Sequence, residues 1–361
     1  MLFHLFTSLV EEFSFFNVFK YLTFRTGLSV MTSLIVVFLI GAPLIKIFSE
    51  KMITGPIRQD GPIDHIVKKS GTPTMGGVII IIGIISSTLL WADLTNIYVW
   101  TLIFISLSLG ALGLLDDVLK IKFKNSSGLK SKYKFTGQLI IGAVALFILV
   151  KYSNHEYLLN LYFPFFKNLV LHLGLFFIPF GLFVIIGASN AVNLTDGLDG
   201  LATVPVMLVA LSFTLISYVV GNTIFSDYLQ IQYIPDVGEL SIFCGSIVGS
   251  CLGFLWYNAP PAKIFMGDTG SLSLGGSLAA IAIIVKHEIV LAIIGGLFVL
   301  ETVSVIIQVI SFKLTGKRIF KMAPIHHHFE KKGWAESTIV IRFWIIAIIL
   351  ALVGLATLKL R

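Results

Sequence analysis

Long apolar stretches alternate with short polar ones along almost the whole chain. A membrane-spanning helix needs roughly 20 mostly apolar residues, and the sequence contains about ten windows of this kind. They cover residues 28–48, 74–92, 96–115, 135–151, 173–191, 200–220, 240–258, 270–286, 289–312 and 338–358. The pattern predicts an all-α, polytopic membrane protein, and an even number of spans places both termini on the same side of the membrane.

The composition supports a membrane protein and a single domain. Of the 361 residues, 56% are hydrophobic and 12% are charged, and the mean hydropathy is +0.95, which lies outside the range of soluble domains. Glu11 and Glu12, together with the lack of a small-residue cleavage site, argue against a cleavable signal peptide. Apart from one run of serine, glycine and acidic residues at 221–239, no linker or repeat divides the chain, so residues 1–361 are expected to form one helical domain.

Lysine and arginine are distributed unevenly between the two sides of the predicted membrane domain. The loops that follow odd-numbered windows carry eighteen of them, whereas the opposite side, termini included, carries seven. The positive-inside rule therefore predicts that the first set of loops faces the cytoplasm and that both termini are periplasmic. The net charge of +7 is explained by topology, and no nucleic-acid partner is expected.

Five unusual polar motifs all fall in or beside the predicted cytoplasmic loops. They are "KKSGTPTMGG" (68–77), "DD" (116–117), "NAVNLTDGLDG" (190–200), "NAPPAKIFMGDTGS" (258–271) and "APIHHHFE" (323–330). The outer loops contain no comparable cluster, so we expect one cytoplasmic site assembled from five loops. A transporter would place ionisable groups near the middle of the membrane, where only Glu301, Gln308 and Arg342 are candidates.

Three aspartates are the strongest candidates for chemistry. Asp116 and Asp117 are adjacent at the end of an apolar window, and neighbours on a helix point about 100° apart. One could bind a metal and the other act as a general base, or the pair could be an interfacial acidic pair balanced by nearby lysines. Asp268 precedes the 270–286 window, where it could cap the helix or face a phosphate at the helix N-terminus across a divalent cation.

Asparagines and aspartates recur every third residue in the third motif. Asn190, Asn193, Asp196 and Asp199 would form one polar stripe at a helix end. The alternative is an ordinary turn rich in Asn, Asp and Gly.

The histidines and the lysine row suggest binding of phosphate or sugar. His326, His327 and His328 are consecutive and cannot all ligate one metal, and no zinc set is completed elsewhere. They are interpreted as donors to phosphate or sugar, with a solvated loop as the alternative. The row "KIKFKNSSGLKSKYK" is a topology determinant that touches anionic lipid, or else it captures a phosphorylated lipid.

Several catalytic signatures are absent from the sequence. There is no GxxxxGK[ST], HExxH or GxSxG motif, so ATP hydrolysis, zinc proteolysis and elbow-type serine chemistry lack support. Phosphates placed among several carboxylates require a counter-cation, because each like-charge pair near 4 Å costs on the order of 4 kcal/mol at an effective dielectric of 20. Mg²⁺ is the natural choice for oxygen ligands and phosphates.

Taken together, these motifs resemble those of the bacterial phospho-N-acetylmuramoyl-pentapeptide transferases, the MraY family, over essentially the whole chain. The resemblance implies ten spans in the inner membrane, with both termini periplasmic and the active site facing the cytoplasm. It implies transfer of phospho-MurNAc-pentapeptide from UDP-MurNAc-pentapeptide to undecaprenyl phosphate, which gives lipid I and UMP in the first membrane step of peptidoglycan synthesis. A homodimer is compatible with the family, although no sequence pattern indicates one.

The resemblance also implies roles for individual residues. Asp268 and Asp117 would work with Mg²⁺ and the pyrophosphate, and Asp116 would deprotonate or position the lipid phosphate, with a covalent intermediate left open. The uridine would be held by Lys69, Asp199, Asn258 and Phe265. The nucleoside, phosphate and sugar region would be lined by Thr74, Asn193, Asp196, Gln308, His327 and His328. The lipid phosphate would be met by Lys120, Lys130 and Lys132.

Two other functions compete with this one. A sister enzyme that loads GlcNAc-1-phosphate onto a polyprenyl phosphate would share the aspartates, but such relatives carry a different histidine loop. A transporter or flippase for a phosphorylated lipid would bind its substrate without releasing UMP and would tolerate a chelator.

Overall fold

The computed structural model describes residues 1–54, 71–123, 128–153, 156–166 and 169–359. The α-helices are α1 (Leu2–Ser8), α2 (Leu22–Glu50), α4 (Gly77–Trp91), α5 (Ile97–Phe123), α6 (Ser131–Tyr152), α7 (Phe177–Thr195), α8 (Thr203–Val220), α9 (Thr223–Leu229), α10 (Leu240–Asn258), α11 (Gly267–Ile284), α12 (Glu288–Ile294), α13 (Gly296–Thr315), α14 (Ile325–Glu330) and α15 (Glu336–Ala356). Four 3₁₀ turns, η1 (Ser14–Lys20), η2 (Glu156–Leu159), η3 (Gly174–Phe176) and η4 (Val237–Glu239), and a small antiparallel hairpin of β1 (Asn160–Tyr162) and β2 (Val170–His172) complete the described elements.

The helices confirm an all-α polytopic membrane protein. Within the described residues, nine helices are long and apolar enough to cross a membrane. The tenth predicted span is α4, whose 15 residues reach only about 22 Å at roughly 1.5 Å per residue, less than the hydrocarbon thickness of roughly 30 Å. The predicted span at 289–312 is not one helix, because the chain divides into α12 and α13 at Gly295.

Helix α11 lies in the middle of the bundle, where it packs against α4, α5, α7 and α8, and 89% of its apolar window is buried. Its small residues allow this close packing. A Cβ on Gly275 would lie 2.5 Å from the Ala188 carbonyl oxygen on α7, and one on Gly276 would lie 2.1 Å from Leu109 Cδ1 on α5. Close approach at small residues is the usual way in which helices associate within a membrane, and here it places the first turn of α11 between its neighbours.

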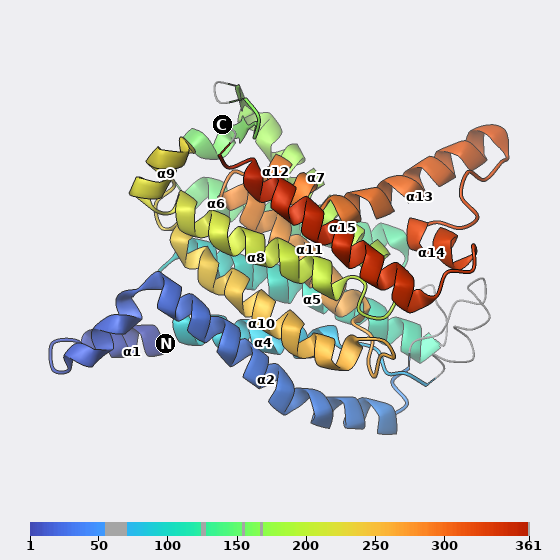
Figure 1. Cartoon of the computed structure of the whole chain (residues 1–361), viewed down its shortest axis with the longest axis horizontal. Coiled ribbons are helices and arrows are strands. Elements are labelled where there is room, and N and C mark those ends of the chain that lie inside the picture. Colours follow the sequence, from blue (N-terminus) through green and yellow to red (C-terminus); the bar gives the residue numbers. More distant parts are fainter. Residues whose placement is uncertain (55–70, 124–127, 154–155, 167–168, 360–361) are drawn as a thin grey trace.

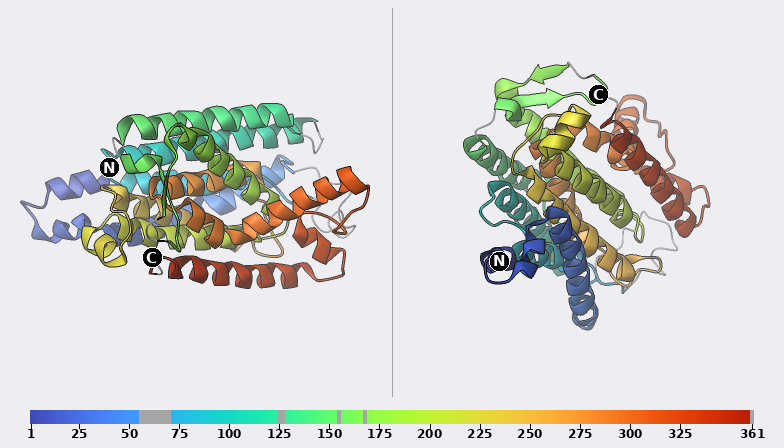
Figure 2. Two further views of the ribbon diagram at one scale, coloured as in Figure 1. Left: turned by 90° about the horizontal axis from the view of Figure 1, so that it is seen from above. Right: turned by 60° about the vertical axis from the view of Figure 1, so that its left-hand side comes forward.

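The two ends of the bundle differ. Both chain termini lie at one end, together with α1, α9 and the β-hairpin, while α14 lies at the other end (Figures 1 and 2). Helix α13 projects away from the rest of the bundle at the α14 end (Figure 1), and only 22% of its apolar window is buried. Because the chain crosses the bundle repeatedly, the described parts of the five polar motifs meet at the α14 end.

Candidate active site

The first and fourth motifs are joined edge to edge by their backbones. Phe265 N–H donates to the Pro73 carbonyl at 2.9 Å, and Gly76 N–H donates to the Phe265 carbonyl at 2.8 Å. Gly77 N–H then donates to the Met266 carbonyl at 2.8 Å. These bonds fix the starts of α4 and α11 beside one another.

Three carboxylates meet where α5 ends and α11 begins. Asp116 and Asp117 lie near the end of α5 and are buried, and Asp268 lies in the first turn of α11. One carboxylate oxygen from each lies within 4.8 Å of those from the other two. The approach of the helices depends on Gly113, because a Cβ there would lie 2.2 Å from the Asp268 carbonyl oxygen.

Asp117 also caps helix α11 from outside. Its Oδ1 accepts from Asp268 N–H at 3.2 Å, and its Oδ2 accepts from Thr269 N–H at 3.0 Å and from Thr269 Oγ1 at 2.7 Å. The first N–H groups of a helix have no partner within the helix, and an anion beside them is stabilised by the helix dipole. The sequence suggested a phosphate at these N–H groups, but two of them donate to Asp117 instead.

Two lysines balance the carboxylates. Lys120 Nζ lies 2.6 Å from Asp116 Oδ2 and 2.9 Å from Asp268 Oδ2. Lys134 Nζ, from α6, lies 2.5 Å from the same Asp268 oxygen and 3.7 Å from Asp116 Oδ2. Lys120 was among the predicted residues, whereas Lys134 was not. The other two predicted lysines, Lys130 and Lys132, are exposed at the start of α6.

Three further predicted residues lie beside this carboxylate cluster (Asp116, Asp117 and Asp268). Asn193 Nδ2 donates to Asp268 Oδ1 at 2.8 Å. Asp196, just after α7, accepts from the Gly267 N–H. Its burial, and to a smaller extent the charges of Asp268 and Asp117, raise the pKa of Asp196 well above the ordinary value.

Thr74 is buried, and its Oγ1 would lie 3.1 Å from a Cβ on Gly267. Gly267 has φ +74° and would bring that Cβ to 2.7 Å from Asp117 Oδ2, so only glycine fits there.

The predicted polar stripe from Asn190 to Asp199 is wrong, because α7 ends at Thr195. Only Asn193 contacts Asp268 from within the helix. Asn190 Nδ2 instead donates to Gln138 Oε1 at 3.0 Å. Asp199 comes after the helix end. Its carboxylate accepts from Ala262 N–H at 2.9 Å and so bonds to the 259–266 loop.

Asp199 and Asn258 both support the 259–266 loop. Asn258 is buried, its Nδ2 donates to the Ile264 carbonyl at 3.0 Å, and its Oδ1 accepts from Thr203 Oγ1 at 2.8 Å. The loop carries Phe265, which is partly buried. The fourth residue predicted to hold uridine, Lys69, lies outside the described residues.

The remaining predicted residues form a group on α13 and α14. Gln308 Oε1 accepts from Ile319 N–H and Phe320 N–H at 3.0 and 2.9 Å, and its Nε2 donates to the Phe320 carbonyl at 2.9 Å. Its amide therefore holds the loop that leads to α14. His327 Nδ1 lies 2.5 Å from Glu330 Oε2.

His328 Nδ1 accepts from the Lys321 N–H at 3.0 Å. A neutral imidazole that accepts at Nδ1 carries its proton on Nε2 and can donate from there. Partial desolvation, together with the positive charges of Lys332 and Lys321, lowers the pKa of His328 below the ordinary value. This side chain is thus suited to donate a hydrogen bond as a neutral ring.

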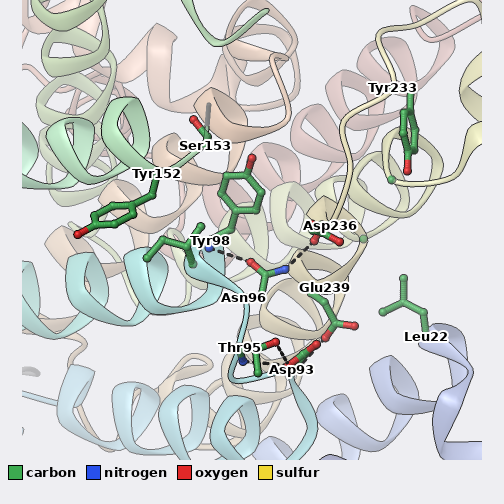
Figure 3. A pocket seen from close by; sticks show the side chains of 13 residues that line it. Leu22, Asp93, Thr95, Asn96, Tyr98, Tyr152, Ser153, Tyr233, Asp236 and Glu239 are labelled. Atoms are coloured by element: carbon green, nitrogen blue, oxygen red, sulfur yellow. Dashed lines mark hydrogen bonds between the residues drawn. The ribbon is translucent and has the colours of Figure 1, made fainter. Parts of the chain in front are cut away.

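A cavity of about 490 Å³ lies at the opposite end of the bundle, and no residue of the five motifs lines it (Figure 3). Its polar groups bond to one another and to the protein around them. Asn96 Nδ2 donates to the Asp236 carbonyl at 2.8 Å, and Asn96 Oδ1 accepts from Tyr98 N–H at 2.8 Å. Glu239 is paired with the buried Arg25 through two bonds of 2.8 and 2.6 Å. These contacts hold η4 against α2 and the start of α5.

The carboxylate cluster has the composition of a divalent-cation site for phosphate chemistry. Mg²⁺ prefers oxygen ligands and is commonly bound by one or two carboxylates together with substrate phosphates. Asp268 and Asp117 present such oxygens, and the Lys120 and Lys134 ammonium groups beside them suit further phosphate oxygens. The residues present therefore fit Mg²⁺.

Comparisons with known proteins point to one family over the whole chain. The family model for glycosyl transferase family 4 matches residues 99–286, and signature 1 of the phospho-N-acetylmuramoyl-pentapeptide-transferases matches residues 69–81. The chain is 69% identical over 361 residues to the phospho-N-acetylmuramoyl-pentapeptide-transferase of Pelagibacter ubique, with both chains covered completely. It is 54% identical to that of Maricaulis maris, again with complete coverage of both. The chain is therefore a member of the phospho-N-acetylmuramoyl-pentapeptide-transferase family.

Proposed function

We propose that this protein transfers phospho-MurNAc-pentapeptide from UDP-MurNAc-pentapeptide to undecaprenyl phosphate, which produces lipid I and UMP at the cytoplasmic face of the inner membrane. The observation that carries the proposal is the meeting of Asp116, Asp117 and Asp268 with two lysines at the ends of membrane-spanning helices. A phosphate carried by a membrane lipid can reach this place from the bilayer, and a soluble nucleotide can reach it from the aqueous side. One pyrophosphate linkage replaces another, so the reaction needs no energy-coupling motif.

Asp268 and Asp117 would hold Mg²⁺ together with the pyrophosphate of the donor. When bound, the ion supplies positive charge that polarises phosphoryl oxygens. Asp268 is the more accessible of the two, since its side chain is 13% exposed and that of Asp117 is 4% exposed. Asn193 orients Asp268 by donating to its Oδ1, which leaves Oδ2 on the side of the two lysines.

Asp116 would accept a proton from the lipid phosphate or position that phosphate for attack. Its Oδ1 is fixed by the Leu129 N–H at 2.6 Å, and its Oδ2 faces Lys120 at 2.6 Å. Lys120 and Lys134 would contact phosphate oxygens through their ammonium groups. The carboxylate and the cations thus act on the acceptor from the α5 and α6 side of the site.

The donor would extend from the cluster toward the loops. We assign the uridine to the 259–266 loop, with Phe265 stacking on the base and with Asp199 and Asn258 shaping the loop beneath it, joined by Lys69. The phosphates and the sugar are assigned to the residues that flank the cluster and to the histidine group, which are Thr74, Asn193, Asp196, Gln308, His327 and His328.

Release of UMP should require both substrates and a divalent cation. With purified protein, UDP-MurNAc-pentapeptide and undecaprenyl phosphate, we expect UMP and lipid I in equal amounts, complete loss of both products with EDTA, and recovery with excess Mg²⁺. Coupled detection of UMP and thin-layer separation of the lipid measure the two products. Lipid binding without UMP release would indicate a transporter, and product formed only from UDP-GlcNAc would indicate the sister transferase.

Lys134→Met should weaken use of the lipid phosphate. The change removes the ammonium that lies beside Asp268 and Asp116 while keeping much of the side-chain volume, so we expect kcat/KM for the acceptor to fall by about 10²-fold. Lys151→Met is the matched control, because Lys151 is exposed in the last turn of the same helix, and its kcat/KM should stay within about twofold. Equal effects of the two substitutions would contradict the role of Lys134.

A further inference from the structure

Glu301 is a buried carboxylate with no role in the reaction described above. It lies in α13, a helix that is largely exposed, yet its side chain is 0% exposed. Burying an ionisable group costs free energy unless the group is paired. A carboxylate in this position therefore needs an explanation from its surroundings.

The partner of Glu301 is His326, the first residue of the histidine triplet. Nδ1 of His326 lies 3.1 Å from Glu301 Oε1, and the side chain of His326 is also 0% exposed. Among the described residues, the carboxylate oxygens of Glu301 and the ring nitrogens of His326 have no hydrogen-bond partner of good geometry, so this 3.1 Å contact is the polar interaction that each side chain has. The pair thus forms a buried polar contact between the body of α13 and the start of α14.

On its other side, His326 rests against the third motif. A Cβ on Gly197 would lie 2.3 Å from His326 Nε2, so the glycine makes room for the imidazole. Gly197 stands between Asp196 and Asp199, which we assign to the donor. The His326 ring also lies 4.1 Å from the His327 ring, centroid to centroid, so one side chain contacts both donor-binding segments.

Helix α14 depends on such anchors. It has six residues, and helices shorter than about 12 residues are marginal in water without tertiary contacts. Gln308 lies seven residues after Glu301, which is about two helical turns and so the same face of α13. From that face Gln308 holds the loop before α14 and Glu301 holds His326 within α14.

We propose that Glu301 is a positioning residue for the nucleotide-sugar donor. Through His326 it fixes α14 against Gly197, and this sets the placement of His327 and His328 relative to the 196–199 segment. The proposal rests on the proposed function, since it takes these segments as the donor site. It makes no use of the acceptor, whose residues lie on α5 and α6.

The test separates donor binding from general stability. Glu301→Leu removes the polar contact and leaves the His326 imidazole without it. We therefore expect the KM for UDP-MurNAc-pentapeptide to rise about tenfold, while kcat and the KM for undecaprenyl phosphate stay within about threefold. Glu301→Gln keeps a polar partner for His326 and should restore most of the donor KM. Thr302→Val is the matched control, because the Thr302 hydroxyl donates to the Phe298 carbonyl of its own helix and, among the described residues, has no role in either donor-binding segment.

Gly197→Ala supplies a second test that does not touch Glu301. The added methyl group would collide with His326 and should raise the donor KM in the same way, which keeps the proposal testable where Glu301→Leu fails to fold. An unchanged donor KM in the folded variants, or a fall in kcat alone in proportion to lost thermal stability, would overturn the proposal. Wild-type protein without transferase activity would instead overturn the proposed function.

Discussion

Asp268→Asn is expected to abolish turnover while the protein remains folded. Asp268 contacts Asn193 through Oδ1 and Lys120 and Lys134 through Oδ2. Asparagine keeps the shape but loses the charge, which weakens metal binding and leaves the two ammonium groups with fewer counter-charges. Since metal-bound charge stabilisation is worth several kcal/mol in phosphoryl chemistry, kcat should fall by at least about 10³-fold.

Two measurements would establish the cause of that loss. The rate of UMP release reports turnover, and titration with Mn²⁺ followed by electron paramagnetic resonance reports cation binding, which should weaken in Asp268→Asn. Asp227→Asn is the control, because Asp227 is exposed on α9 at the opposite end of the bundle, and it should leave both quantities unchanged. Turnover of Asp268→Asn within tenfold of the wild type would contradict the assignment.

The membrane-spanning helices could be predicted because the signal for them is local. Each needs only a sufficiently long apolar window, and most predicted windows coincide with one helix. The exception is the window 289–312. Its residues stay apolar on both sides of Gly295, but the helix is interrupted at that glycine. A Cβ on the neighbouring Gly296 would lie 3.1 Å from Leu350 on α15, so this glycine allows close packing, but hydropathy alone carries no information about a break in the backbone.

The carboxylates were found for a related reason. A charge costs free energy in an apolar environment, so Asp116 and Asp117 at the end of such a window stand out. Lys134 carries no comparable signal, because it is one of several lysines in a polar loop and the start of α6. What distinguishes it from Lys132 is the position of α6 relative to α11, which is a tertiary property.

The failure of the predicted stripe and the cap made by Asp117 have the same origin. A three-residue spacing predicts a shared face only while the helix continues, and the backbone of α7 leaves the helix at Asp196. Likewise, the N–H groups at the start of α11 could be expected to bind an anion, but the anion that the fold supplies is Asp117 from α5. Which groups satisfy a helix end depends on neighbouring helices, and these are distant in the sequence.

Gly113→Ala and Gly77→Ala are expected to reduce both activity and stability strongly, although neither glycine has a side chain to contribute to catalysis. A Cβ on Gly113 would lie 2.2 Å from the Asp268 carbonyl oxygen, and one on Gly77 would lie 2.0 Å from Gly270 N. These are backbone atoms and cannot move by rotating a side chain, so the first turn of α11 must shift by about 1 Å. Such overpacking costs about 1–3 kcal/mol of stability, and a shift of this size at reacting groups lowers kcat by about 10²-fold.

Gly187→Ala provides the matched control for these two substitutions. Gly187 lies within α7, and an added Cβ would have no atom within 4 Å. Alanine there should leave kcat unchanged and should not lower the melting temperature, because alanine has the higher helix propensity. Melting temperature in detergent and kcat for UMP release test the three variants together. If Gly113→Ala and Gly77→Ala matched Gly187→Ala in both measurements, the close approach of α4 and α5 to α11 would not be what places Asp268 beside Asp116 and Asp117.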